Sequence, residues 1–354
     1  MFERDGTARA EGGAARRCYA RRMTSLERIR QRGHVRWGFV GCGDVTEVKS
    51  GPAFSRIPGS SVSVVMRRDA EKARDYAARH QVPRWTTDAT EVIESDDVDA
   101  VYVATPPSSH AAYALQAAAA GKPVYVEKPL ALDRTEGEAM VRACEAAGVP
   151  LFVAYYRRAL PRFEFVRARL HDGSIGEPTM VQCELHQPPP GDPDAPGWRW
   201  RADIGGDGLL MDLGSHGLDL LDHWLGPIVE ARSFTARRLP WADVTDEVVA
   251  TLRFESGVLG SAAWGFAGPT RADRITVVGS AGSVSVPLFA DAPVRVCDEH
   301  GACVEHAIAH PAHVQEPLIR AIVEALLGRG GGSPSTGVSA LRTQAVLDAL
   351  LERG

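Results

Sequence analysis

Short apolar runs alternate with helical patterns between residues 35 and 155, and this alternation constrains the fold of the chain more than any other feature. The runs cover residues 35–40, 61–66, 99–104, 123–126 and 150–155. Strands that are apolar on both faces and separated by helices form a parallel sheet covered on both sides. The sequence therefore predicts a parallel α/β domain over 35–155, whose ligand binds at the carboxyl ends of the strands.

The pattern changes after residue 156, where most strand-like segments follow one another without an intervening helix. Six of them cover residues 228–235, 247–254, 258–266, 274–278, 283–288 and 293–297. Strands in series form an antiparallel or mixed sheet. We therefore expect a second, α+β domain over 156–354. It has an open mixed or antiparallel sheet and ends in helices near 314–327 and 338–351.

Residues 1–34 contain nine arginines and four acidic residues, and they show no apolar periodicity. This composition predicts a disordered basic tail, or an over-extended start that precedes the true one at Met23. No apolar stretch follows the arginine pairs, so the segment does not have the pattern of a secretory signal.

The chain has 354 residues and a net charge of −5 at pH 7, which gives no electrostatic reason to expect nucleic acid as a partner. No apolar run approaches the ~18 residues of a membrane span. The six cysteines form no C-x-x-C pair, which argues against a disulfide framework or a zinc site and favours a reducing cytoplasm. The late histidines and Cys303 fit no zinc pattern either, so no metal site is predicted.

The motif GCGDVT directly follows the first predicted strand, at residues 41–46. Glycines at such a turn let the backbone bend sharply and let a pyrophosphate approach the start of the next helix. Thr46 stands where the G-x-G-x-x-G pattern has its third glycine, so the motif is imperfect. Its place after the first strand nevertheless favours dinucleotide binding by Gly41, Gly43, Asp44 and Val45.

The end of the second predicted strand carries Arg67 and Arg68, and no acidic residue stands at the spacing that an NAD-preferring site usually has. Arginines there suit the 2′-phosphate of NADP, so NADP is favoured and NAD stays possible; two solvated surface arginines are the alternative. After the strand 99–104, Thr105, Pro106 and His110 should line the same cleft. For His110, a polar residue in the first turn of a helix is the alternative.

Two further motifs carry ionisable groups. Glu127 and Lys128 follow the strand 123–126 and are predicted to contact the cofactor. Partial burial would make the lysine proton available for chemistry, and an exposed ion pair between the two is the alternative. Asp212, His216 and Asp219 are spaced i, i+4 and i+7, which places them on one face of a helix. A carboxylate one turn from an imidazole can orient the ring for acid/base catalysis, whereas a capping aspartate and a structural histidine are the alternative.

Four segments, GFVGCGDVTEVKSGPAF, ATPPSSH, GKPVYVEKPLAL and GGDGLLMDLGSHGLDLLDHWLG, occur in this order, and together they resemble the Gfo/Idh/MocA family of oxidoreductases over residues 35–354. The resemblance implies a Rossmann domain and a C-terminal domain whose open sheet assembles homodimers or homotetramers. It implies that Lys128 touches nicotinamide ribose and substrate, that Asp212 and His216 supply the acid/base partner, and that Arg68 goes with NADP. It also places four side chains in the cleft between the domains: Tyr156, Arg157, Trp200 and Arg201.

The sequence thus predicts an NAD(P)-dependent oxidoreductase that transfers hydride between a nicotinamide cofactor and a secondary alcohol or ketone of a sugar or cyclic polyol. A dihydrodiol-type dehydrogenase with a less polar substrate and a non-catalytic dinucleotide sensor are the alternatives; Lys128 and His216 favour the enzyme over the sensor. Asp207 departs from the family pattern by interrupting its run of three glycines. Trp264 and Phe266, in the strand 258–266, are expected on the open face of the second sheet, where they would mark the assembly surface.

Overall fold

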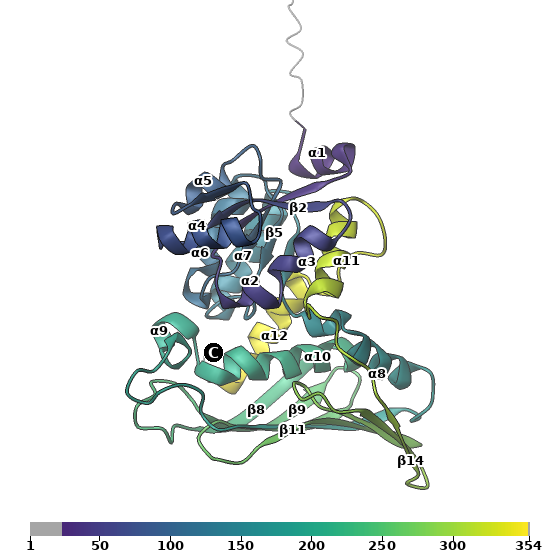
Figure 1. The fold of residues 1–354 in the computed structure, drawn as a ribbon. Coiled ribbons are helices and arrows are strands. Elements are labelled where there is room, and N and C mark those ends of the chain that lie inside the picture. Colours follow the sequence, from purple (N-terminus) through teal and green to yellow (C-terminus); the bar gives the residue numbers. More distant parts are fainter. Residues whose placement is uncertain (1–22, 353–354) are drawn as a thin grey trace, which may run out of the picture.

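The computed structural model describes residues 23–352, and its first half contains a parallel sheet of six strands (Figure 1). The strand order is β3-β2-β1-β4-β5-β6. The strands are β1 (Val35–Val40), β2 (Ser60–Met66), β3 (Arg84–Thr86), β4 (Ala100–Val103), β5 (Val124–Val126) and β6 (Leu151–Val153). This order is that of the doubly wound dinucleotide-binding fold, so the predicted Rossmann-type architecture is confirmed.

Helices cover both faces of this sheet. They are α2 (Asp44–Val48), α3 (Gly51–Arg56), α4 (Ala70–Arg79), α5 (Ala89–Ile93), α6 (His110–Ala119) and α7 (Arg134–Ala146). Alternate residues of β1 serve the two cores: Trp37 packs against Phe54 of α3, whereas Val40 belongs to the core that includes Ala114 of α6. Strand β1 pairs with β2 on one side and β4 on the other, and ligands of such sheets bind where the strand order reverses in this way.

A further helix, α1 (Ser25–Arg32), corrects the prediction of a disordered tail over 1–34. Thr24 begins this helix with a capping box, and Ile29 is fully buried. Arg32 Nη1 lies 2.6 Å from Asp99 Oδ2, which ties the helix to the end of the sheet. A single buried isoleucine is too little for an apolar periodicity, which is why the sequence pattern did not indicate it. Residues 1–22 lie outside the described residues.

The second half contains a sheet of eight strands in the order β14-β13-β12-β11-β7-β10-β9-β8. They are β7 (Pro178–His186), β8 (Ile228–Ala236), β9 (Glu247–Phe254), β10 (Leu259–Gly265), β11 (Ala272–Gly279), β12 (Gly282–Val286), β13 (Val294–Asp298) and β14 (Cys303–His306). Strands β7 and β10 are parallel, and the other neighbours are antiparallel. The predicted mixed sheet is therefore confirmed.

Helices lie on the side of this sheet that faces the first domain (Figure 1). They are α8 (Pro161–His171), α9 (Ala202–Gly205), a π-helix over Leu210–Gly214 and α10 (Ser215–Leu225). The last two helices, α11 (Glu316–Leu326) and α12 (Gly337–Leu350), contact both halves: α11 packs against α3, and α12 packs against α7 and α10. None of the helices within residues 23–352 is long and apolar enough to cross a membrane.

The opposite face of the second sheet exposes large apolar side chains, but not the ones that the sequence predicts. Trp264 and Phe266 are each 1% exposed, so their expected place on the open face is wrong. In β10, Trp264 shares the buried face with Ala262 and packs against the helix layer at Gly214. The exposed apolar side chains of this face include instead Met180 and Leu259, which lie opposite each other on β7 and β10, and Phe234 and Val249, which lie opposite each other on β8 and β9.

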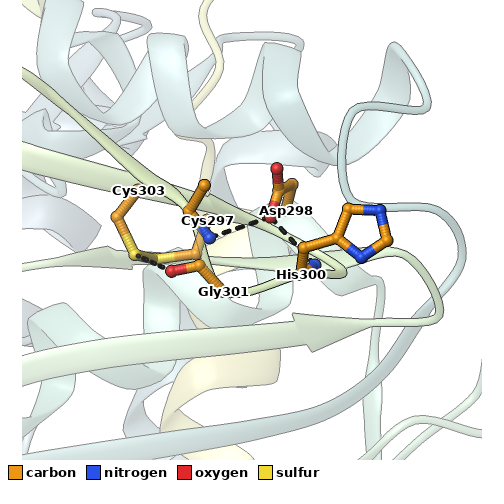
Figure 2. The surroundings of a disulfide bond; sticks show 6 residues. Cys297, Asp298, His300, Gly301 and Cys303 are labelled. Atoms are coloured by element: carbon orange, nitrogen blue, oxygen red, sulfur yellow. Dashed lines mark hydrogen bonds between the residues drawn. A yellow bond between two sulfur atoms is a disulfide. The ribbon is translucent and has the colours of Figure 1, made fainter.

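Cys297 and Cys303 form a disulfide in the hairpin of β13 and β14, which corrects the prediction that the cysteines form no disulfide (Figure 2). The two residues lie opposite each other in the antiparallel register, a juxtaposition that no short spacing motif reports. The Asp298 carboxylate accepts hydrogen bonds from the N–H groups of His300 and Ala302 and so closes the turn between the strands.

Candidate active site

The glycine loop after β1 has the geometry that close approach of a phosphate requires. Gly41 has a φ of +91°, and a Cβ atom there would lie 2.8 Å from the carbonyl oxygen of Ala104, so only glycine fits without strain. At Gly43 no atom lies within 4 Å of the Cβ position, so the start of α2 is open to a ligand. These residues fit the pyrophosphate of a dinucleotide, with the first N–H groups of α2 supplied by Asp44 and Val45.

Thr46, the departure from the glycine pattern, is accommodated inside the loop. It is fully buried, and its hydroxyl donates to the carbonyl oxygen of Gly43 at 2.8 Å. The Tyr76 hydroxyl in turn donates to the Thr46 carbonyl oxygen at 3.1 Å. The glycine that allows close packing is Gly51 instead, because a Cβ atom at Gly51 would overlap the Thr46 carbonyl oxygen. The departure therefore leaves the loop intact.

Arg67 and Arg68 follow β2 beside this loop. Arg67 Nη1 donates to the carbonyl oxygen of Cys42 at 2.9 Å, so this guanidinium fixes the glycine loop. Arg68 is exposed, and the carboxylate of Asp69 caps α4 by accepting from the Lys72 N–H. Of the two arginines, Arg68 is therefore the one whose charge is available to a 2′-phosphate.

His110 is fully buried and joins two loops of the first domain. Its Nδ1 lies 2.9 Å from the Pro129 carbonyl oxygen, and its Nε2 lies 2.8 Å from that of Thr105. Burial lowers the pKa of the ring despite these contacts. His110 thus holds its backbone neighbours, and its predicted place as a cofactor-binding side chain is corrected. Thr105 and Pro106 lie at the carboxyl end of β4, where the Thr105 side chain adjoins Gly41.

Lys128, at the end of β5, reaches across to the second domain. Its Nζ donates to the Asp212 carbonyl oxygen at 2.7 Å and also to the Asp212 carboxylate. The second carboxylate oxygen of Asp212 lies 2.6 Å from Nε of Arg199. Burial opposes ionisation of Asp212, but the charges and hydrogen bonds of Lys128 and Arg199 hold the carboxyl pKa well below its usual range. Asp212 is therefore a carboxylate clamped between two cations.

The predicted pairing of Asp212 with His216 is wrong, because Asp212 lies in a π-helix and not in an α-helix. The wider turn of a π-helix breaks the alignment of residues four apart. Gly214 allows this turn to pack closely: a Cβ atom there would lie 3.2 Å from Trp264 Nε1. His216 Nδ1 is buried without a hydrogen-bond partner among residues 23–352.

The His216 imidazole lies among aromatic rings and positive charges. Its ring centroid is 5.3 Å from that of Tyr156 and 5.9 Å from that of Phe289. Burial and then the charges of Arg157, Lys128 and Lys49 lower its pKa well below the usual value. The ring is therefore neutral at pH 7.

Glu127 does not pair with the Lys128 ammonium. Its Oε1 accepts from the Tyr102 hydroxyl at 2.6 Å and from Gln315 Nε2 at 2.7 Å, and Gln315 Oε1 accepts from the Tyr125 hydroxyl at 2.7 Å. This buried network joins β4 and β5 to the segment that precedes α11. Glu127 therefore positions the lysine loop, which corrects its predicted contact with the cofactor and also excludes the alternative of an exposed ion pair with Lys128. Gln315 carries no motif that the sequence could have revealed.

Of the four predicted cleft residues, the structure brings two to His216. Tyr156 contacts the imidazole, and the Arg157 guanidinium lies over the Tyr156 ring. Trp200 is buried against Trp241, and Arg201 is exposed and pairs with Asp203, which corrects both predictions. The residue that reaches the site from this loop is Arg199.

The sequence did not predict two residues of the site, Arg199 and Lys49, for different reasons. The W-R-W-R sequence at 198–201 contains two arginines, Arg199 and Arg201, and its pattern does not distinguish them. The 3₁₀ turn Trp198–Trp200 determines which of the two reaches the site. Lys49 is one of only four lysines in the chain, a rarity that is itself a signal.

Asp219, the third residue of the predicted helix face, lies in a separate ionic cluster. Its carboxylate accepts from Arg158 Nε and Nη2, each at 2.8 Å. Asp222 accepts from Arg158 and Arg342 in the same cluster. These groups are satisfied by one another, so Asp219 contributes to the packing of α10 and is not placed beside His216. Within residues 23–352 no three His, Cys, Asp or Glu side chains gather as a metal site would need.

A loop shaped for a pyrophosphate, with a lysine held at the carboxyl end of another strand of the same sheet, defines the class: a dinucleotide-dependent oxidoreductase. A family model described as an oxidoreductase family with an NAD-binding Rossmann fold matches residues 35–155, and that of the GFO/IDH/MocA C-terminal domain matches residues 163–285. The chain is 35% identical to oxidoreductase P35 of Formosa agariphila over 314 residues, which cover 87% of this chain and 96% of that protein. It belongs to the Gfo/Idh/MocA family of oxidoreductases, which confirms the predicted resemblance.

Two further proteins are similar over most of their length. The 1,5-anhydro-D-fructose reductase of Ensifer adhaerens is 28% identical, over 83% of this chain and 89% of the reductase. Among solved structures, the aldose–aldose oxidoreductase from Caulobacter crescentus complexed with glycerol has a TM-score of 0.79 and 26% identity. That match covers 90% of this chain and 97% of the other.

Proposed function

We propose that this oxidoreductase transfers a hydride between a pyridine nucleotide and a secondary alcohol, or the corresponding ketone, of a sugar or cyclic polyol. The cross-domain pair of Lys128 and Asp212 carries this proposal. It holds the Lys128 ammonium at the carboxyl end of β5, and the glycine loop lies at the same edge of the sheet. The names of a 1,5-anhydro-D-fructose reductase and an aldose–aldose oxidoreductase among the similar proteins support a carbohydrate substrate.

Oxidation of an alcohol to a ketone removes a hydride from carbon and a proton from oxygen. When bound, a nicotinamide supplies the hydride chemistry, in either direction. The glycine loop would hold its pyrophosphate, and the residues after β4 and β5 would face its nicotinamide half. The protein's own task is to orient the substrate oxygen, to stabilise its charge and to move its proton.

Lys128 suits the stabilising role. Its side chain is 12% exposed, so little water screens its charge. The Asp212 carboxylate binds the ammonium and is itself held by Arg199, so the position of the ammonium is fixed. A hydrogen bond from Lys128 Nζ to the substrate oxygen would favour the alkoxide character of the transition state. Asp212 acts here as a positioning residue for the lysine.

His216 suits the role of proton acceptor in oxidation. A neutral imidazole can accept a proton, and its lowered pKa keeps the ring neutral at pH 7. The same low pKa leaves little imidazolium at pH 7 to donate a proton in the reverse reaction, so it favours the role of His216 in oxidation. Among residues 23–352 nothing is bonded to its buried Nδ1, so the ring is oriented by packing against Tyr156 and Phe289.

For the cofactor we propose NADP rather than NAD. Arg68, with its exposed guanidinium, is the second residue after β2, at the strand end where the adenosine ribose of such cofactors binds. Asp69, the nearest acid in sequence, is engaged as the N-cap of α4. A positive charge without a competing carboxylate favours a 2′-phosphate over a 2′-hydroxyl.

We further propose a homodimer or homotetramer assembled through the open face of the second sheet. The exposed Phe234 and Val249 lie opposite each other on that face, as do the exposed Met180 and Leu259, and adjacent exposed apolar side chains mark an interface. The proposal of a cytoplasmic location is weakened by the Cys297–Cys303 disulfide, because cytosolic thiols are usually kept reduced.

The test of the proposed function is the absorbance of NADPH and NADH at 340 nm during incubation with a panel of aldoses, anhydro sugars and inositols. Turnover that depends on Lys128 is the expected result, with Lys128→Met as the matched variant. Tight nucleotide binding without turnover on any member of the panel would instead favour a dinucleotide sensor.

A further inference from the structure

Three arginines within residues 23–352 are buried, and they differ in their partners. Arg157, Arg158 and Arg162 are 5%, 3% and 2% exposed. Arginine is seldom buried unless its charge is paired. Arg158 and Arg162 obey this rule through ion pairs with Asp219, Asp222 and Asp291. Arg157 has no carboxylate partner within the described residues, so its charge is buried without a counterion.

The Arg157 guanidinium is held in place, but its hydrogen-bonding capacity is not used up. Its Nε donates to the Leu288 carbonyl oxygen at 3.0 Å. Its central carbon lies 4.9 Å from the Tyr156 ring centroid and 4.3 Å from that of Phe289. Nη1 is buried and has no partner within the described residues. A rigidly held guanidinium with an unused buried N–H is costly unless a ligand satisfies it.

This guanidinium borders the proposed reaction site. Tyr156 and Phe289, the two rings that contact it, are the rings that contact the His216 imidazole. After burial, the charge of Arg157 is the foremost cause of the lowered pKa of His216, ahead of Lys128 and Lys49. The surroundings of His216 are therefore positively charged.

The carboxylates of this region cannot neutralise Arg157, because they are engaged elsewhere. Asp212 is clamped by Lys128 and Arg199. Asp273 accepts hydrogen bonds from the N–H groups of Leu288, Phe289 and Ala290, at 2.6 to 2.7 Å. Asp273 thereby fixes the loop whose carbonyl oxygen and aromatic ring hold Arg157. The site is built to present this arginine, and its counterion must come from outside the described chain.

We infer that the substrate brings this counterion: a carboxylate that binds Nη1 of Arg157, which makes the substrate a sugar acid and not a neutral sugar. The inference rests on the proposed function and narrows its substrate class. A carboxylate brings one negative charge to balance the single charge of Arg157, whereas a phosphate monoester brings about 1.5 to 2 at pH 7. The carboxylate is therefore the anion of choice.

The test compares substrates that differ only at C6: D-glucuronate with D-glucose, and D-galacturonate with D-galactose, with D-glucose 6-phosphate as the phosphate arm. We expect kcat/KM of the wild type to be at least about 10-fold higher for a uronate than for its neutral partner. Arg157→Gln should reduce this ratio by about 10- to 100-fold, mainly through KM. Arg157→Lys should fall between them, because lysine keeps the charge and loses the planar fork.

Controls separate recognition from folding. Arg320→Gln, at an exposed arginine of α11 paired with Glu316, should keep the wild-type ratio. Arg157→Gln should not lower the melting temperature, because it removes an unpaired buried charge, whereas Arg158→Gln should lower it by leaving the buried Asp219 carboxylate without its cation. A lower melting temperature of Arg157→Gln together with an unchanged substrate ratio would make Arg157 a structural residue and overturn the inference.

Calorimetry of D-glucuronate binding to the NADP-saturated protein decides the inference independently of turnover. Binding that Arg157→Gln weakens at least about 10-fold supports it even if no tested sugar is oxidised, a result that would defeat only the proposed reaction. Any one of four results would overturn the inference. They are equal use of glucose and glucuronate, preference for the phosphate, absence of uronate binding, and an Arg157→Gln effect confined to NADP affinity.

Discussion

The ammonium of Lys128 and the carboxylate of Asp212 meet across the two domains of this protein, and Lys128 also donates to the Asp212 backbone carbonyl. Lys128 ends a strand of the nucleotide-binding sheet, and Asp212 lies in the π-helix that precedes α10. The pair therefore forms only when both domains are folded and in contact. Arg199 holds the outer oxygen of the same carboxylate at 2.6 Å. This arrangement makes the site a property of the domain contact and not of either domain alone.

Removal of residues 1–33 should destabilise the protein, contrary to what a disordered tail would imply. A chain that begins at His34 loses α1, with the buried Ile29 and the ion pair from Arg32 to Asp99. Loss of one buried isoleucine alone costs about 2–5 kcal/mol, so we expect the melting temperature to fall by about 5 °C or more. The reference is a chain that begins at Met23. Equal melting temperatures for the two chains would show that α1 does not support the fold.

Glu47 should contribute stability that is lost in acid. The hydrogen bond from Arg79 and that from His80 lower the pKa of Glu47 from 4.5 to about 2. A lowered carboxyl pKa gives stability that is fully present above pH 4.5 and lost as the pH falls toward 2. Because Arg79 is half exposed, we expect Glu47→Gln to cost only about 1 kcal/mol at pH 7.

Melting curves of the wild type and Glu47→Gln over this pH range provide the measurement. The gap between them should close as the pH approaches 2. A gap that stays constant from pH 7 to pH 2 would mean that ionisation of Glu47 has no part in it.

The open sheet face should drive assembly. Val249→Glu combined with Leu259→Glu places charges on neighbouring strands of that face, and we expect this variant to dissociate into monomers at micromolar concentration. Val304→Glu, at a similarly exposed valine on the edge strand β14, is the matched control and should keep the wild-type assembly. Sedimentation velocity makes the comparison; a wild type that is already monomeric would refute the proposed interface.

Arg68 should set the cofactor preference. We expect the wild type to bind NADPH more tightly than NADH, and Arg68→Ala to weaken NADPH by about 10- to 100-fold while NADH changes about 2-fold at most, because a charge-assisted bond to a phosphate is lost. Arg74→Ala, at an exposed arginine of α4, serves as the control. Fluorescence titration gives the six dissociation constants, two for each protein. Tighter binding of NADH by the wild type would reverse the assignment.

The nucleotide domain could be predicted from sequence because its signals are local. Buried strands such as β4 and β5 read as continuous apolar runs, and the glycine motif follows the first of the strands. Strand β3 escaped prediction because it has three residues, two of them exposed, at the edge of the sheet. Edge strands of that kind carry no apolar pattern.

The site was harder to predict where geometry depends on packing between distant segments. Asp212 and His216 have helical spacing, yet in the π-helix Asp212 binds Lys128 instead of the imidazole, and no local pattern reports such a turn. The same limit applies to Trp264. A period of two shows that β10 has two faces, but the helix layer above Gly214 decides which face is buried.

The most direct test of the central claim is the rate of hydride transfer in single turnover for the wild type, Lys128→Met, His216→Ala and Asp212→Asn, each measured beside its NADPH dissociation constant. If Lys128 stabilises the substrate oxygen and His216 takes its proton, the first two variants should each lose at least about 100-fold in rate while the dissociation constant changes far less. Asp212→Asn should fall between these variants and the wild type. Wild-type hydride transfer by Lys128→Met would contradict the claim, and wild-type transfer by His216→Ala would leave Lys128 or water to take the proton.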